Sequence, residues 1–137
     1  YAHASFKNYT QVETVNGQSV EVDYSGKFVS SAPQHTANVY LNYSKKLENS
    51  FFTGVYGTLS YSGIGKIYWQ DSNEISEDFY SLADAVVGVK KNAFGLELWG
   101  KNLLNTSYNA FYFESFGNKF FQQGKPLQVG ARLTLEI

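Results

Sequence analysis

Apolar and polar residues alternate along several stretches of this chain. In residues 35–45, Ala37, Val39, Leu41 and Tyr43 fall on one side of an extended backbone, and most positions between them are polar. A period of two is typical of a β-strand with two different faces. The same alternation predicts further strands over residues 2–7, 51–62, 80–90, 94–99 and 129–137.

One side of each predicted strand is mainly aliphatic and the other is polar. In the last strand, Arg132, Thr134 and Glu136 occupy the alternate positions, so that side faces water rather than a dry core. The opposite side is continuously aliphatic. The pattern therefore predicts an all-β, antiparallel fold in which the aliphatic side needs an apolar environment.

The connections between the predicted strands alternate between long and short. The first long connection contains the turn dipeptides Asn16-Gly17 and Ser25-Gly26 and an alternating stretch over residues 20–24, which predicts a small hairpin. Spanning β-barrels have short turns at one end and long loops at the other. The long connections are residues 12–34, 63–79 and 102–125, and the short ones are residues 46–50 and 91–93.

The length of the predicted strands also suits a membrane. Strands of ten to twelve residues exceed the usual ~5–6, and with a tilt of ~45° they span about 25 Å. Aromatic residues fall near the predicted strand ends, where spanning barrels carry aromatic girdles. These residues are Tyr43, Phe51, Tyr61, Tyr80 and Phe94.

Composition excludes several other classes of protein. The mean hydropathy of the 137 residues is -0.31, and no run approaches the ~18 apolar residues of a spanning helix. A net charge of -1 without a Lys/Arg cluster argues against a nucleic-acid partner. Because cysteine is absent, there is neither a disulfide framework nor a thiolate metal site.

Six strands are too few for a closed barrel. The smallest spanning barrels have eight strands, and an open edge leaves backbone groups unpaired in hydrocarbon. The chain is therefore expected to be a piece of a larger barrel, completed by other sequence or by identical copies. A soluble ligand-binding barrel of the lipocalin kind needs about eight strands, which does not fit the count.

Two sequence motifs carry a resemblance to a known family. Residues 98–108, Leu-Trp-Gly-Lys-Asn-Leu-Leu-Asn-Thr-Ser-Tyr, resemble the xNLxNxxY signature of TonB-dependent outer-membrane receptors, and Gly124-Lys125-Pro126 resembles the entry into the last strand of that family. Residues 24–27 and 32–38 are similar to the GKxxPxxPxHxxN segment of the family. The resemblance covers essentially all of residues 1–137.

This resemblance implies that the chain forms the last six strands of a barrel of about 22 strands in the outer membrane of a Gram-negative bacterium. The plug domain and the segment that contacts TonB lie near the N-terminus in this family and are absent here. The implied partners are the lipid bilayer, the rest of the barrel and its plug, TonB and the barrel assembly machinery. Family members usually end in an aromatic residue, whereas this chain ends in Ile137.

The resemblance also implies a transport function. Such receptors bind a scarce small-molecule nutrient on extracellular loops and import it with energy from TonB. An iron–siderophore complex is the commonest cargo in the family, and haem, cobalamin and glycan are the alternatives. A porin or a barrel with a catalytic rim built on His35 is a further alternative. We expect no enzyme and no cofactor, because neither a nucleophile elbow nor a metal-spaced His pair nor a phosphate loop occurs.

Aromatic residues in the long connections are the candidate ligand contacts. Planar side chains provide a large contact area at little entropic cost. The alternative is that they pack the connections against one another. The candidates are Tyr68, Trp69, Tyr112, Phe113 and Phe116, together with Phe111, Phe120 and Phe121.

Charged residues on the polar side of the strands are expected to face the barrel lumen, where they pair across strands or contact the plug. A structural role is favoured over haem ligation for His3 and His35. A solvated loop is favoured over a Ca²⁺ site for the acidic residues Asp71, Glu74, Glu77 and Asp78. The lumen-facing set is Lys7, Asp84, Glu97, Lys101, Arg132 and Glu136.

Overall fold

The computed structural model describes residues 4–15 and 17–136, which form strands β1 to β11 and no helix. No helix long and apolar enough to cross a membrane is found in this described part. The chain divides into two compact units, each of which is treated by itself. The sheet unit comprises residues 37–63, 81–108 and 123–136, and the loop unit comprises residues 4–36, 64–80 and 109–122.

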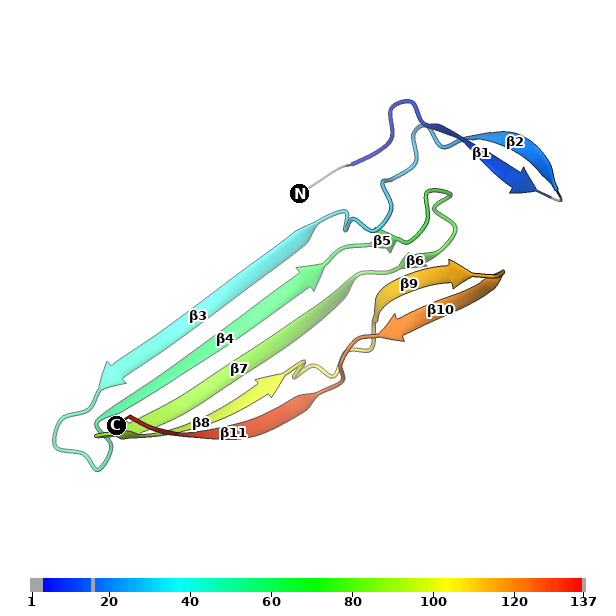
Figure 1. Cartoon of the computed structure of the whole chain (residues 1–137). Helices are drawn as coiled ribbons and strands as arrows, with labels where there is room; N and C mark the ends of the chain where they lie inside the picture. The colour runs from blue at the N-terminus through cyan, green and yellow to red at the C-terminus, as the bar shows by residue number, and fades with distance from the viewer. Residues whose placement is uncertain (1–3, 16, 137) are drawn as a thin grey trace. The chain divides into compact units, whose positions relative to one another are not determined.

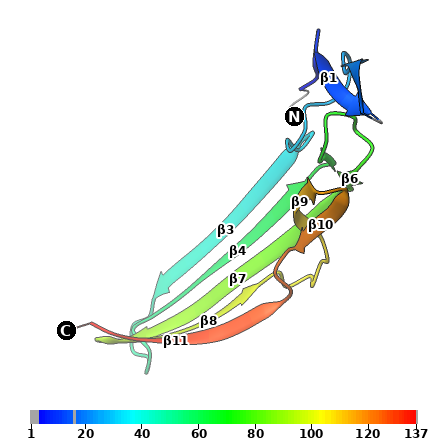
Figure 2. The ribbon, with the colours of Figure 1, turned by 45° about the vertical axis from the view of Figure 1, so that its right-hand side comes forward.

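A five-stranded antiparallel sheet forms the sheet unit, with the strand order β11-β8-β7-β4-β3 (Figure 1). The five strands stay side by side when the view is turned (Figure 2). Two short and two long connections alternate between them, as the sequence predicted. The strands are β3 (Thr36–Lys46), β4 (Gly54–Ile64), β7 (Tyr80–Lys91), β8 (Phe94–Lys101) and β11 (Gln128–Leu135).

The predicted strand boundaries are confirmed to within two residues except at the start of β4, which begins at Gly54 rather than at residue 51. Residues 51–53 belong to the connection instead. The N–H of Leu47 donates to the carbonyl of Thr53 at 3.0 Å, which holds this turn. Phe51 is therefore outside the strand, and its side chain is 69% exposed.

The predicted strand over residues 2–7 is wrong for the part that the structure describes. Residues 4–7 make a single isolated bridge, between Ser5 and Phe28, and belong to the loop unit. The apolar side chain of Phe6 packs on Tyr9, with ring centroids 4.5 Å apart, instead of joining an aliphatic face. Lys7 is consequently not on the sheet, and the described residues form an open sheet of five strands rather than a closed barrel.

The loop unit contains three pairs of short strands. The hairpin predicted around residues 20–24 is confirmed, and its register pairs Thr10 with Asp23 and Val15 with Gln18. The pairs are β1 (Thr10–Val15) with β2 (Gln18–Asp23), β5 (Ile67–Tyr68) with β6 (Ser76–Glu77), and β9 (Asn109–Ser115) with β10 (Asn118–Gln123).

The long connection predicted over residues 102–125 contains the β9–β10 hairpin, which the sequence analysis did not predict. Phe116 and Gly117 both adopt positive φ angles, 48° and 72°, so they form the two-residue turn whose twist suits a hairpin. Phenylalanine is unusual at such a position. The sequence therefore lacked the Asn-Gly or Asp-Gly signal by which such turns are recognised.

The two faces of the sheet differ as the alternation predicted. Residue rows run across the strands, and one of them joins Val89 on β7, Leu96 on β8 and Leu133 on β11. These apolar side chains have no cover among the described residues: Leu133 is 76% exposed and Leu96 is 46% exposed. We call this side the apolar face.

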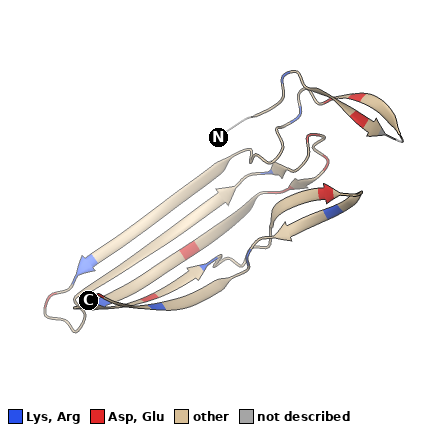
Figure 3. Cartoon of the chain, viewed as in Figure 1, with Lys and Arg blue, Asp and Glu red and all other residues tan. Residues whose placement is uncertain are grey.

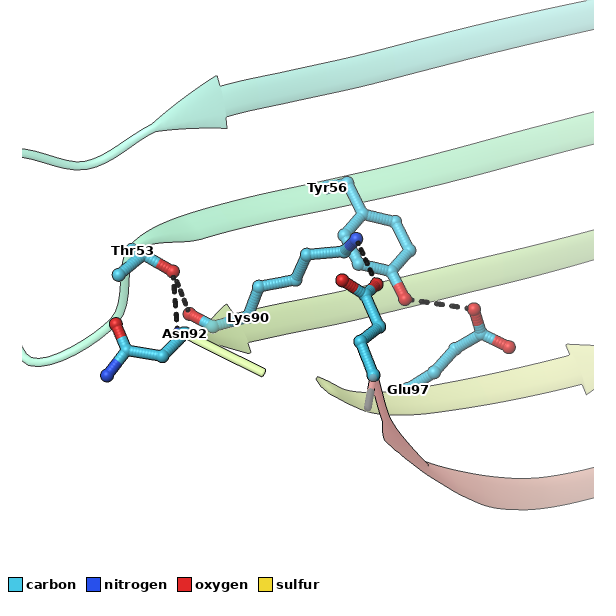
Figure 4. Close-up of polar contacts among 6 residues, drawn as sticks. Thr53, Tyr56, Lys90, Asn92 and Glu97 are labelled. Atoms are coloured by element: carbon cyan, nitrogen blue, oxygen red, sulfur yellow. Dashed lines mark hydrogen bonds and ion pairs between the residues drawn. The ribbon is translucent and has the colours of Figure 1, made fainter. Parts of the chain in front are cut away.

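The opposite side, the polar face, carries ionic and hydrogen-bonded pairs (Figure 4). Arg132 lies directly across from Glu97 in the register, and their side chains approach to 3.2 Å. The hydroxyl of Tyr56 donates to Glu97 at 3.0 Å, and Lys90 pairs with Glu136 at 3.3 Å. Because a one-residue slip exchanges the two faces, these pairs and the aliphatic rows fix the same register.

The side chain of Asn102 holds the point where the chain leaves β8. It is 5% exposed and has a positive φ of 48°. Its amide nitrogen donates to the carbonyls of Thr106 and Lys125 at 2.9 and 3.0 Å, and its oxygen accepts the N–H of Thr106 at 2.9 Å. The backbone N–H of Asn102 donates to Asp84 at 2.8 Å. One side chain thus joins the exit from β8 to the approach to β11.

Neighbouring motif residues join the same two segments. The side-chain oxygen of Asn105 accepts the N–H of Leu127 at 3.2 Å. The ring of Tyr108 covers Gly124, where an added Cβ would lie only 2.0 Å from a ring carbon. A side chain at position 124 would have to displace this ring. The two motifs at residues 98–108 and 124–126 thus form one structural unit, which we call the Asn102 clasp.

Replacing Asn102 by Ala is expected to destabilise the full-length protein by about 3 kcal/mol. Three part-buried side-chain hydrogen bonds disappear, and backbone groups of Thr106 and Lys125 lose their partners, at ~1 kcal/mol or more for each bond. The free energy of unfolding is measured by urea titration of the refolded protein in detergent. Asn38→Ala, at an exposed position of β3, is the matched control. Equal stability of the two variants would contradict the role of the clasp.

Candidate functional site

The loop unit is built from three chain segments that hold one another in place. The amide side chain of Asn73 accepts the N–H of Phe28 at 2.7 Å and donates to its carbonyl at 2.9 Å. Lys27 donates to the carbonyl of Ser72 at 2.7 Å. These bonds join the first segment to the second, in which Ile67 is buried at 8% exposure.

The third segment attaches through Tyr112, a predicted ligand contact. Its hydroxyl donates to Glu114 at 3.0 Å, and Gln70 donates to the same carboxylate at 2.9 Å. Burial, followed by the bond to Glu114, raises the pKa of Tyr112. Its ring lies 5.0 Å from that of Phe121, and only 6% of its surface is exposed. The structure therefore places Tyr112 inside the unit, where it packs the segments together.

Two further predicted contacts, Tyr68 and Trp69, are half-buried. Tyr68 stacks on Phe28 with centroids 5.5 Å apart and planes 13° apart. The backbone N–H of Trp69 donates to the carbonyl of Ile75 at 2.8 Å. The indole N–H of Trp69 is buried and has no hydrogen-bond partner among the described residues.

The remaining predicted contacts lie exposed on the β9–β10 hairpin. Phe113 stacks on Phe120 with centroids 4.9 Å apart, and Phe116 at the turn is fully exposed. Exposed large apolar groups gathered on one element mark interaction surfaces. We call this surface the phenylalanine hairpin; its exposed members are Phe111, Phe113, Phe116, Phe120 and Phe121.

An acidic cavity of roughly 670 Å³, which the sequence did not predict, lies between the first and second segments. A hydrogen bond that the Tyr24 hydroxyl donates to Glu13, together with burial, raises the pKa of Tyr24 to about 12. A hydrogen bond from Ser25 lowers the pKa of Asp23. The charged residues that line the cavity are Glu13, Asp23, Asp71, Glu74 and Lys27.

No sequence signal predicted this cavity, because its residues come from two segments far apart in the chain. Sequence reasoning singled out Asp71 and Glu74 but not the residues of the first hairpin. Among the described residues, no group of three or more His, Cys, Asp or Glu side chains is arranged to hold a metal ion.

The other predicted residues have separate positions. His35 packs over Gly65 and stacks on Phe79 with centroids 6.2 Å apart, while His3 lies outside the described residues. Asp84 accepts the backbone N–H of Asn102, and Lys101 is exposed at the end of β8, opposite Gln128. Glu97, Arg132 and Glu136 form the pairs of the polar face. Their orientation toward a lumen stays a prediction.

The charged positions on the ribbon are few (Figure 3). On the sheet strands, Asp84 on β7 and Glu97 on β8 are the carboxylates of the polar face. Long strands with one aliphatic and one sparsely charged face are the pattern of spanning barrels.

An antiparallel sheet with these faces and long connections is similar to part of a β-barrel receptor. Among solved structures, the fold matches the ferric yersiniabactin uptake receptor FyuA from Yersinia pestis, with a TM-score of 0.73 and 17% sequence identity. The match covers 82% of this chain and 17% of that receptor, so the chain spans under a fifth of its length. No protein-family model matches the sequence.

Replacing Glu13 by Gln is expected to lower the pKa of Tyr24 from about 12 toward that of an ordinary tyrosine, because the carboxylate no longer holds the phenol proton. Since the pKa is raised in the folded state, the stability contributed by this contact is full below pH ~10 and is lost as the pH rises through about 12. Phenolate absorbance is recorded against pH for the full-length protein and for Tyr24→Phe. The difference between the two curves gives the midpoint of the Tyr24 titration. An unchanged midpoint in Glu13→Gln would count against this contact.

Proposed function

We propose that this chain is a segment of a TonB-dependent outer-membrane receptor that imports an iron–siderophore complex. In this proposal, strands β3, β4, β7, β8 and β11 form part of the barrel wall. The three segments of the loop unit are extracellular. The plug and the TonB contact belong to other parts of the protein.

The uncovered apolar face is the observation that carries this proposal. The five strands expose aliphatic side chains such as Val87, Leu98 and Val129, at 57%, 54% and 72% exposure. A soluble protein rarely leaves so large an apolar surface in water, whereas the outer side of a spanning barrel requires one. The fold similarity to the ferric yersiniabactin uptake receptor supports the same interpretation.

The pattern of connections supports an extracellular loop unit. Its three segments precede β3, join β4 to β7 and join β8 to β11, while the connections at residues 47–53 and 92–93 are short. In spanning barrels the short turns face the periplasm and the long loops face outward. The phenylalanine hairpin then belongs to the outer surface, where a ligand arrives.

The transport proposal is tested by uptake of ⁵⁵Fe in iron-limited cells whose only copy of the receptor is the full-length protein. Chemically distinct ferric siderophores, together with haem, are supplied in turn. We expect uptake of a ferric siderophore that stops when TonB is deleted. Uptake of haem but of no ferric siderophore would mean that the protein is a haem transporter. Uptake that continues without TonB would contradict the proposal.

Phe116→Ala is expected to weaken binding of the transported siderophore by about tenfold, because an exposed ring contributes ~1–1.5 kcal/mol to a stacked contact. The change should leave stability unaffected, since the side chain is 100% exposed. Affinity is measured on the purified full-length protein by fluorescence quenching. Val12→Ala, an exposed aliphatic position on β1, is the control. Equal siderophore affinity of the two variants would show that the hairpin turn is not part of the binding surface.

A further inference from the structure

The apolar face carries charge at only one of its ends. The register places Lys91 in one row with Phe94 and Leu135, next to the row of Val89, Leu96 and Leu133. Lys91 therefore belongs to the apolar face. Lys90, one position earlier, points to the polar face and pairs with Glu136.

Two contacts extend the face assignment to β4 and β3. An added Cβ on Gly57 would lie 3.6 Å from the side chain of Val87, so Gly57 shares the apolar face. Thr58 on β4 donates to Asn42 on β3 at 2.9 Å, which places both on the polar face. By alternation, Lys45 falls on the apolar face of β3 and Lys46 on the polar face.

Lys45 and Lys91 are thus the only charged strand residues on the apolar face of the described sheet, and both are cations. Both lie at the end of the sheet where the chain makes its short connections. β3 and β7 are separated by β4, so the two backbones are about 10 Å apart. Flexible lysine side chains can converge on a single group across that distance.

Aromatic side chains accompany the two lysines. The Lys91 ammonium lies 3.2 Å from the ring centroid of Phe51, which is 69% exposed. Phe94 is 58% exposed and pairs with Lys91 in the register, and Tyr43 is 61% exposed. Amphipathic rings and long cationic side chains both favour the boundary between hydrocarbon and headgroups.

A shallow apolar groove of roughly 500 Å³ has Tyr43 in its lining, two residues before Lys45 on β3. Its floor is low because Gly57 has no side chain, and an added Cβ would lie 3.2 Å from the carbonyl of Val86. The aliphatic and aromatic side chains that line it are Leu41, Tyr43, Val55, Leu59 and Val87.

We propose that this surface is a binding site for an anionic phospholipid, with the phosphate between Lys45 and Lys91 and an acyl chain in the groove over Gly57. The inference rests on the proposed outer-membrane barrel, in which the short connections face the periplasm. Charge complementarity selects this occupant: the face is otherwise uncharged, and both of its ionic groups are positive. A second copy of the chain would place lysine against lysine or leave the cations unpaired in an apolar interface.

The test measures binding of a fluorescent phosphatidylglycerol and of a phosphatidylcholine with the same acyl chains to the full-length protein in a neutral detergent. Each lysine close to an anionic lipid contributes about fivefold to the affinity. We therefore expect a preference for phosphatidylglycerol that falls about fivefold in Lys45→Gln or Lys91→Gln and up to about 30-fold in the double variant. Lys46→Gln, the neighbouring cation on the polar face, is the matched control and should keep the preference.

Several outcomes would overturn the lipid site. One is that the double variant keeps the preference, and another is that Lys46→Gln loses it equally. If inorganic phosphate displaces phosphatidylglycerol when both are present at the same concentration, the two lysines bind any anion and no lipid site exists. A dimer that binds neither lipid would mean that a second copy covers the face.

Faster gel migration of the unheated protein separates this test from the transport proposal, because it reports a closed barrel whether or not a lipid binds. A preparation that shows this mobility without the lipid preference refutes the lipid site alone. A preparation without this mobility refutes the barrel itself.

Discussion

Backbone pairing in a fixed register is the constraint on which the rest of this structure depends. Side chains on a strand point alternately to opposite faces, so a slip of one residue would put Glu97 among the aliphatic rows and Leu96 in the polar network. The Glu97–Arg132 pair and the aliphatic row of Leu96 therefore favour the same alignment. Because both faces are sharply different, the alternation in the sequence specifies the sheet strongly.

The strands of the sheet could be predicted because each carries its own alternating pattern. The strand expected over residues 2–7 failed for a related reason: a short pattern with one large apolar residue, Phe6, is satisfied as well by packing on Tyr9 as by a sheet. The β9–β10 hairpin was missed because its turn uses Phe116 at a positive φ, where residue preferences point elsewhere. Local pattern thus predicted the long strands better than the short ones.

The candidate site was harder to predict, since exposure is a property of the folded unit. Tyr112 and Phe113 are consecutive aromatic residues, and they looked equivalent in the sequence. The folded unit buries Tyr112 at 6% exposure and leaves Phe113 at 47%. The acidic cavity joins Glu13 and Asp23 to Asp71 and Glu74 from another segment. Only the contacts between segments, such as those of Asn73 with Phe28, bring these groups together.

The motifs that resemble a receptor family have a structural explanation here. Asn102, Asn105 and Tyr108 form the clasp with residues 124–127, and each makes a contact that maintains the approach to β11. None of these three belongs to the phenylalanine hairpin or lines the acidic cavity. In the proposed receptor, the residues that maintain the fold are therefore different from the candidate ligand contacts. Exposed positions such as Phe116 can change without breaking a clasp contact, which lets one sheet architecture carry loop surfaces of different chemistry.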